Sequence, residues 1–169
     1  TQSKNGMWEQ RFFTEGKLAP CWGYQIDETA SVIYGIYEHY KIVKDIKFLK
    51  DVYKMCENAT KFLEIYLDNV LGTKDESDVV KKEIEQTYHT EGRNKLPVSY
   101  DLWEMHEGVH LYSLSAIYAA FEAMKQIHIV LKPNYEQNNR LKVEAMNKLE
   151  EKMIKYQEEI KKYILTNLY

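Results

Sequence analysis

The chain has 169 residues, which is the length of one ordinary domain and too short for several independent modules. Its 23 basic and 26 acidic residues give a net charge of −3, and no basic patch accumulates around its 14 tyrosines, so we expect no nucleic-acid partner. The longest apolar runs are short and interrupted, which predicts no membrane association and no signal peptide.

Two helices are predicted in the first half of the chain. From Glu28 to about Val43 apolar residues recur at spacings of three and four, and the acidic residues at the start favour a helix N-terminus. Asp45 is a suitable N-cap for a second, longer helix, in which the 3.6-residue apolar pattern continues until Gly72. The next stretch, residues 73–99, is polar and predicts a long loop with one short helix over 75–87.

Two further helices are predicted in the second half. The helix that begins near Leu111 has apolar residues on one side and alanines on the other, so both faces can pack, as in an inner helix. From Glu136 to Tyr163 a single apolar stripe among lysines and glutamates predicts a solvent-facing helix, with the stripe at Leu141, Ala145, Leu149, Met153, Tyr156, Ile160 and Tyr163. No strand-like alternation persists, so we expect one all-α domain over 1–169, built of antiparallel helical hairpins.

The ends of the sequence and its two cysteines bear on whether the chain is a fragment and on its redox compartment. It begins at Thr1 without an initiator Met and stops at Tyr169 inside a helical pattern, so we expect a fragment of a longer product. Cys21 and Cys56 are too few for a disulfide scaffold and form no C-x-x-C pair. This usage is compatible with a reducing compartment, and we expect the protein in the cytoplasm.

The segment YDLWEMHEGVHLYS, residues 100–113, contains two competing chemical signatures. The first is His106-Glu107-Gly108-Val109-His110, which fits the zinc pattern H-E-x-x-H. In that pattern a helix places both imidazoles on one face, and the glutamate activates a metal-bound water. Ser113 and Ala116 stand where the extended pattern has Gly and the third His, so only Glu122 or Glu136 would be left to serve as a third ligand, and no pattern points to either.

Gly108 adds a second argument against the zinc signature. A glycine inside a helix costs about 1 kcal/mol relative to alanine and suits a helix start or a turn better. A helix that begins near Gly108 would not present both histidines on one face. We therefore expect no metal and no cofactor, and a zinc hydrolase using His106, Glu107 and His110 is the least favoured alternative.

The second signature is Asp101-Leu102-Trp103-Glu104, and other motifs accompany it in a fixed order. WGYQIDET at 22–29 precedes it, and GVH at 108–110 and AIYA at 116–119 follow it. In this order the motifs resemble W-x-x-Q-x-D-E-T, D-L-W-E-E, G-V-H and A-x-Y-A of the bacterial branch of glycoside hydrolase family 15, the glucoamylase, glucodextranase and trehalase group. The resemblance covers most of residues 11–125.

The resemblance implies a fold and a set of site residues. The fold is an (α/α)6 barrel, of which this chain would be a part, with substrate bound at one end of the helices. Glu104 takes the place of the general acid, which protonates the glycosidic oxygen in an inverting mechanism. The resemblance implies that Trp22 stacks on a sugar ring and that Gln25, Asp27 and Asp101 bind its hydroxyls. It also implies that the indole of Trp103, at the substrate, shields the acid from water.

The sequence also departs from the family pattern. Met105 stands where the family has a second Glu, and the family's catalytic base lies beyond the last position here. We therefore expect this chain to carry the acid half of a site for α-linked glucoside oligosaccharides and to be inactive alone. We also expect it to form a homo-oligomer or to be completed by the rest of the barrel. The main alternative is a non-catalytic carbohydrate-binding or regulatory helical module.

Overall fold

Helices account for most of the described chain. The computed structural model describes residues 2–8, 11–17, 19, 25–71, 99–135 and 139–168. Over these ranges the long helices are α1 (Ile26–Val43), α2 (Ile46–Leu71), α4 (Leu111–Leu131) and α5 (Arg140–Asn167), and a short 3-10 helix, η1 (Lys132–Asn134), follows α4. The all-α prediction is confirmed. The helix expected over 75–87 and the stop at Gly72 lie outside the described residues.

A short hairpin was missed by the sequence prediction of helices and loops. Strand β1 (Ser99–Tyr100) pairs antiparallel with β2 (Glu107–Gly108), with Ser99 opposite Gly108 and Tyr100 opposite Glu107. Each strand has only two residues, which is too short for an alternating apolar pattern to be visible in the sequence.

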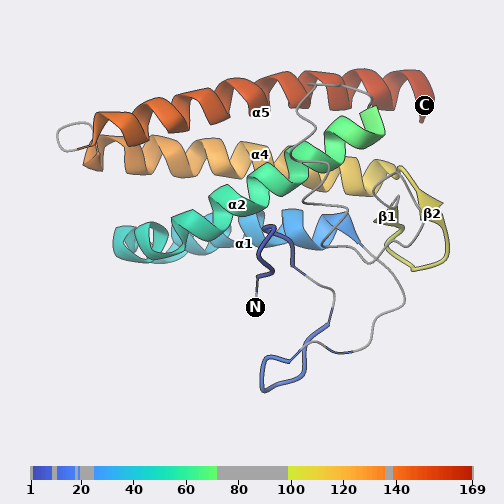
Figure 1. Cartoon of the computed structure of the whole chain (residues 1–169), viewed down its shortest axis with the longest axis horizontal. Coiled ribbons are helices and arrows are strands. Elements are labelled where there is room, and N and C mark those ends of the chain that lie inside the picture. Colours follow the sequence, from blue (N-terminus) through green and yellow to red (C-terminus); the bar gives the residue numbers. More distant parts are fainter. Residues whose placement is uncertain are drawn as a thin grey trace.

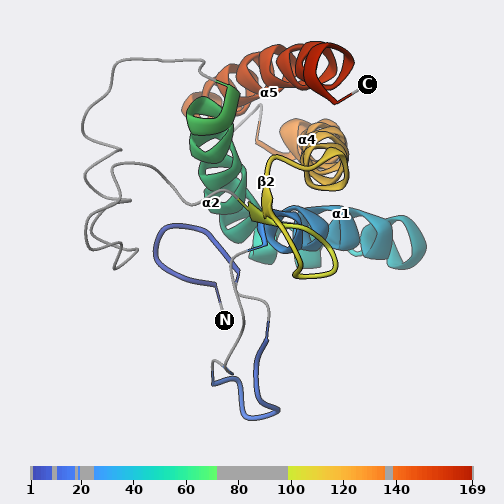
Figure 2. The ribbon, with the colours of Figure 1, turned by 90° about the vertical axis from the view of Figure 1, so that its right-hand side faces the viewer.

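The helices are arranged so that two of them begin at the same end of the bundle. Helix α1 lies beside α4 and runs in the same direction, while α2 crosses over them and α5 runs antiparallel to α4 on its other side (Figures 1 and 2). Because α1 and α4 start together, Gln25, which precedes α1, lies near the turn that precedes α4. The β1–β2 hairpin lies at this end (Figure 1).

Helix α4 is an inner helix, as its two packable faces predicted. It contacts α1, α2 and α5, and its buried residues come from more than one side of the helix: Ser113, Leu114, Ile117, Ala120, Phe121, Ala123, Met124, Ile127, His128 and Leu131. Burial of the apolar side chains among them against three neighbours stabilises the centre of the bundle.

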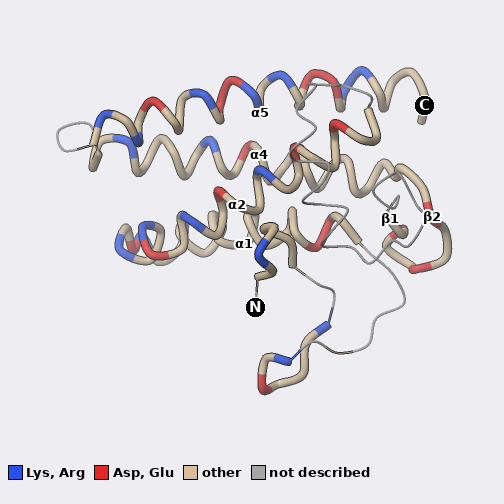
Figure 3. Tube along the Cα trace, viewed as in Figure 1, with Lys and Arg blue, Asp and Glu red and all other residues tan. Residues whose placement is uncertain are grey.

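Helix α5 is solvent-facing, as predicted, but the predicted apolar stripe is wrong at the beginning of the helix. Charged residues follow one another along its length (Figure 3), and Leu149, Met153, Tyr156 and Ile160 are buried. Leu141, however, is 78% exposed, and Ala145 is exposed beside the buried Met146. The stripe continues instead through Lys142, whose Nζ lies 4.7 Å from the centre of the Tyr53 ring and 3.9 Å from that of Tyr135.

The turn between α1 and α2 confirms the predicted N-cap. The backbone N–H of Phe48 donates to Asp45 Oδ1 at 3.1 Å. Lys44 has a left-handed backbone with φ of 58°, and its N–H donates to the carbonyl of Tyr40 at 2.8 Å, which closes the end of α1. This C-cap and N-cap together allow the chain to reverse within a few residues.

The N-terminal segment 2–8 is held against α1 and α2. Gln2 Nε2 donates to the carbonyl of Met55, Met7 is buried, and the N–H of Trp8 donates to Thr29 Oγ1 at 3.0 Å. Gly6 makes the close approach possible, because a Cβ at this position would lie 2.3 Å from the carbonyl oxygen of Asn58, and its φ is +99°.

Replacing Gly6 with alanine is expected to release this segment from α2. The segment lies at the edge of the bundle, so we expect it to detach rather than compress the helix, at a cost of about 1–2 kcal/mol. Urea unfolding checks the loss. The control is Gly35→Ala on α1, where a Cβ meets nothing within 4 Å and is expected to stabilise the helix by about 0.5–1 kcal/mol. Equal stabilities for the two variants would contradict this account.

Candidate functional site

The β1–β2 hairpin is tied to the N-terminal end of α1. The first helical N–H, that of Ile26, donates to Ser99 Oγ at 3.0 Å, and Ser99 is fully buried. Helix N-termini have N–H groups without partners inside the helix, so the serine hydroxyl satisfies one of them. The hairpin and the start of α1 therefore form one unit, although 73 positions separate the two residues in the sequence.

Asp101 organises the turn between the strands, residues 101–106. Its Oδ1 accepts from the N–H of Met105 at 2.8 Å and from the N–H of His106 at 3.4 Å. These hydrogen bonds, above all that from Met105, lower the pKa of Asp101. Gln25 Nε2 donates to the Asp101 carbonyl at 2.6 Å. The structure thus brings Gln25 and Asp101 together, and their described hydrogen bonds hold the turn.

Glu104 lies on this turn in an unusual backbone conformation. Its φ is 58°, a left-handed value that side chains with a Cβ rarely adopt, and its N–H donates to the Asp101 carbonyl at 3.0 Å. Glycine or asparagine is the usual residue at such a position. The chain has an acid there, at a cost of roughly 1–2 kcal/mol.

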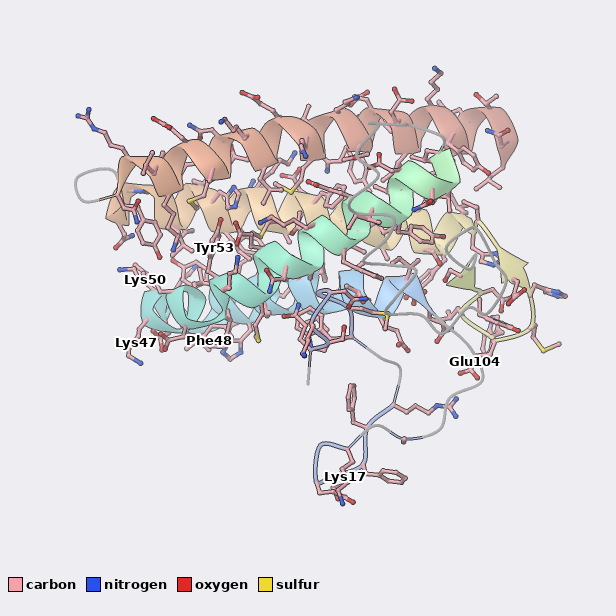
Figure 4. The ribbon with its side chains drawn as sticks, viewed as in Figure 1. Lys17, Lys47, Phe48, Lys50, Tyr53 and Glu104 are labelled. Carbon is pink, nitrogen blue, oxygen red and sulfur yellow. The ribbon has the colours of Figure 1, made fainter. Side chains whose placement is uncertain are left out.

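The carboxylate of Glu104 is held by an arginine that the sequence motifs did not include. Arg11 Nη2 lies 2.7 Å from Glu104 Oε1, and the glutamate side chain is only 22% exposed. Figure 4 shows Glu104 on the side of the hairpin that faces segment 11–17. No sequence spacing pointed to this pair, because its members are 93 positions apart.

The indole of Trp103, which was expected to shield Glu104 from water, is itself largely exposed. Its side chain is 78% exposed, and its neighbours Leu102 and Met105 are 49% and 70% exposed. An indole that is so accessible leaves its ring face open to solvent. The other expected aromatic contact, Trp22, lies outside the described residues.

Asp27 lies in the interior beneath the hairpin. It is 4% exposed, and Oδ1 accepts a hydrogen bond from Ser113 Oγ of α4 at 3.3 Å. Burial raises the pKa of Asp27, and its own backbone N–H, Ser113 and His110 partly oppose this. Its described contacts therefore join α1 to α4, whereas the family resemblance implied a ligand for sugar hydroxyls.

The H-E-x-x-H segment is not helical. Glu107 and Gly108 form β2, and α4 begins only at Leu111, so the two histidines do not lie one turn apart on a helix face. His110 Nε2 lies 3.0 Å from the carbonyl oxygen of His106, which brings the ring to the backbone. Among the described residues, no group of three or more His, Cys, Asp or Glu side chains is placed to hold a metal ion.

Comparison with known protein families, with curated proteins and with solved structures finds no match to this chain. In the part of the chain that the structure describes, no helix is long and apolar enough to cross a membrane. The geometry of the hairpin is therefore the basis for assigning a function.

Proposed function

We propose that this chain supplies the general-acid side of a site that hydrolyses α-linked glucosides with inversion, and that Glu104 is the acid. The proposal joins the resemblance of the DLWE motif and its neighbours to the geometry of the hairpin. In this role Glu104 donates a proton to the glycosidic oxygen, while a carboxylate from elsewhere activates water on the opposite face of the sugar.

The observation that carries the proposal is the left-handed backbone of Glu104. Strained residues of this kind cluster at functional sites, although Lys44 has the same φ of 58° in the structural turn between α1 and α2. A glycine at this position would relieve the backbone and leave Asp101 and its hydrogen bonds intact. The left-handed backbone at an acidic residue therefore supports a functional role for the Glu104 carboxylate.

The helix arrangement is consistent with the same proposal. In our proposal α1 and α4 are neighbouring inner helices of an (α/α)6 barrel, and α2 and α5 are the outer helices of the same two hairpins. Parallel inner helices start at one end, where the connecting segments can surround a substrate. Gln25, Asp101, Glu104 and Arg11 all lie on segments that lead into α1 or α4.

The remaining hairpins of the barrel, or a second copy of the chain, would cover the outward side of α1. Tyr34 and Ile42 are 47% and 84% exposed on that helix, and such apolar surface favours association. The predicted self-association stays a prediction, which light scattering tests: a stable monomer at high concentration would argue against it.

Replacing Glu104 with glutamine tests the assignment directly. In the complete protein, Glu104→Gln is expected to lower hydrolysis of maltose, isomaltose or trehalose by about 10²–10⁴-fold and to leave binding intact, because the amide cannot donate the acid proton. The matched control is Glu107→Gln, an exposed acid on the same hairpin, which should retain full turnover. Equal rates for the two variants would end the assignment.

One observation favours the alternative of a non-catalytic carbohydrate-binding module. The indole of Trp103 is 78% exposed, and an accessible ring can stack on a pyranose without any catalytic carboxylate. Calorimetry separates the two functions. A binding module would bind maltose through Trp103 and show no turnover in any assembly, and Trp103→Ala would then remove the heat of binding while Glu104→Gln would not.

A further inference from the structure

His110 lies between the base of the hairpin and the start of α4. Its Nε2 is 3.2 Å from the carbonyl oxygen of Ser99 in β1 and 3.0 Å from that of His106, the residue just before β2. Carbonyl oxygens only accept hydrogen bonds, so Nε2 carries the proton and shares it between them. A single N–H group thus connects the two sides of the hairpin.

Gly108 leaves room for this imidazole. A Cβ at position 108 would lie 3.2 Å from Cε1 and 3.4 Å from Nε2 of His110, and the first of these distances is shorter than an ordinary contact. Gly108 does not need a left-handed backbone, so its role here is steric. The glycine of the GVH motif and its histidine are therefore parts of one arrangement, in which the ring is seated against the β2 backbone.

The same hairpin carries the turn on which Glu104 lies. Asp101 N–H donates to the His106 carbonyl at 2.9 Å, and the Asp101 carboxylate accepts from the N–H groups of Met105 and His106. The His106 carbonyl is thus a shared acceptor for the turn and for His110. Loss of the His110 donor would leave that carbonyl with the Asp101 N–H and would remove the hydrogen bond that connects it through His110 to Ser99 of β1.

We propose that His110 is a positioning residue, which holds the turn 101–106 in the conformation that presents Glu104. The effect on catalysis rests on the proposed function, whereas the contact of His110 with the two carbonyls does not depend on it. A displaced acid loses its alignment with the glycosidic oxygen, and a shift of about 1 Å can cost roughly 100-fold in rate. In this role the histidine acts through the backbone and does not touch the substrate.

Two substitutions at His110 distinguish the effect of its N–H donor from the effect of its ring volume. His110→Phe keeps the ring and removes the N–H, while His110→Gln keeps an N–H at about the reach of Nε2. Amide hydrogen exchange by NMR reports the turn directly. In His110→Phe we expect exchange of the Met105 and His106 amides to rise about tenfold, and in His110→Gln to stay near the wild-type rate. His106→Phe, at an exposed side chain of the same motif, is the control and should leave the Met105 amide unchanged.

Turnover of maltose or isomaltose in the complete protein gives the second readout. His110→Phe is expected to lower kcat by about 100-fold with little change in KM, and His110→Gln to recover most of the loss. Unchanged exchange in His110→Phe overturns the proposal, and so does an equal loss in the Phe and Gln variants that tracks a loss of global stability. If exchange responds as expected but no glucoside is hydrolysed by any form, the positioning contact is supported and the proposed function is what fails.

Discussion

Replacing Glu104 with glycine is expected to stabilise the fold and to remove hydrolysis in the same variant. The left-handed φ of 58° costs a residue with a Cβ about 1–2 kcal/mol, which glycine avoids. The lost ion pair with Arg11, whose side chain is 46% exposed, opposes this by at most about 1 kcal/mol. We expect a net gain of about 0.5–1 kcal/mol in the free energy of unfolding and a fall in turnover of about 10²–10⁴-fold.

Glu104→Ala is the matched control for this prediction. Alanine also lacks the carboxylate and the ion pair but keeps the Cβ, so the difference in stability between the two variants isolates the backbone conformation. Glycine should be more stable than alanine by about 1 kcal/mol in urea unfolding, and both should be inactive. Equal stabilities would show that position 104 is not left-handed in solution, and residual turnover in either variant would show that Glu104 is not the acid.

Replacing Glu64 with glutamine is expected to stabilise the protein strongly at alkaline pH and little at acid pH. Glu64 on α2 is 6% exposed, and its Oε1 is buried without a hydrogen-bond partner among the described residues. Burial raises the pKa of Glu64 from 4.5 to about 7, and Lys152, whose Nζ lies 3.8 Å from Oε2, offsets only part of that effect. Ionised Glu64 is therefore an incompletely paired charge inside the bundle.

The sign of the pH dependence follows from that raised pKa. Between pH 4.5 and about 7 the folded state binds more protons at Glu64 than the unfolded state does, so the group lowers the free energy of unfolding as pH rises. Above pH 7 the full penalty is present, of the order of 3 kcal/mol for such a shift. Because glutamine stays neutral but still buries a polar amide, Glu64→Gln should gain about 2 kcal/mol at pH 8.5 and close to nothing at pH 4.5.

Urea unfolding at several pH values measures this difference, and Glu57→Gln on the same helix is the control. Although burial by itself raises the pKa of Glu57, hydrogen bonding by Lys54 and the charge of Lys61 lower it overall. Glu57→Gln should therefore lose a little stability at alkaline pH, where Glu64→Gln gains it. If the gain in the free energy of unfolding for Glu64→Gln does not change with pH, the pKa of Glu64 is not raised by burial.

The sequence alone determined where the long helices lie and which faces they bury. The 3.6-residue period depends only on neighbours along the chain, so it located α1, α2 and most of α5, and it identified α4 as an inner helix. Asp45 is a local case of the same kind, because an N-cap and the N–H that it accepts are three positions apart. The period failed at Leu141, where Lys142 covers the tyrosine rings.

The candidate site was only partly accessible from the sequence. The motif order singled out Gln25, Asp101 and Glu104, and the structure brings these three together at the hairpin. Whether Glu104 acts as an acid and Gln25 binds sugar are predictions that the experiments above test. The high exposure of Trp103 could not be read from its place beside an acid in the motif.

Only the tertiary structure decided which distant groups meet at the site. The ion pair of Arg11 with Glu104 and the hydrogen bond of Ile26 with Ser99 join positions 93 and 73 residues apart, and no local period encodes such distances. The burial of Glu64 was also decided by the tertiary structure. Glu64 and the exposed Lys61 lie only three positions apart on α2, so the helical period does not distinguish them. Sequence periodicity reports which face of an element is buried, whereas the partners and the pKa of a group depend on what the other elements place against that face.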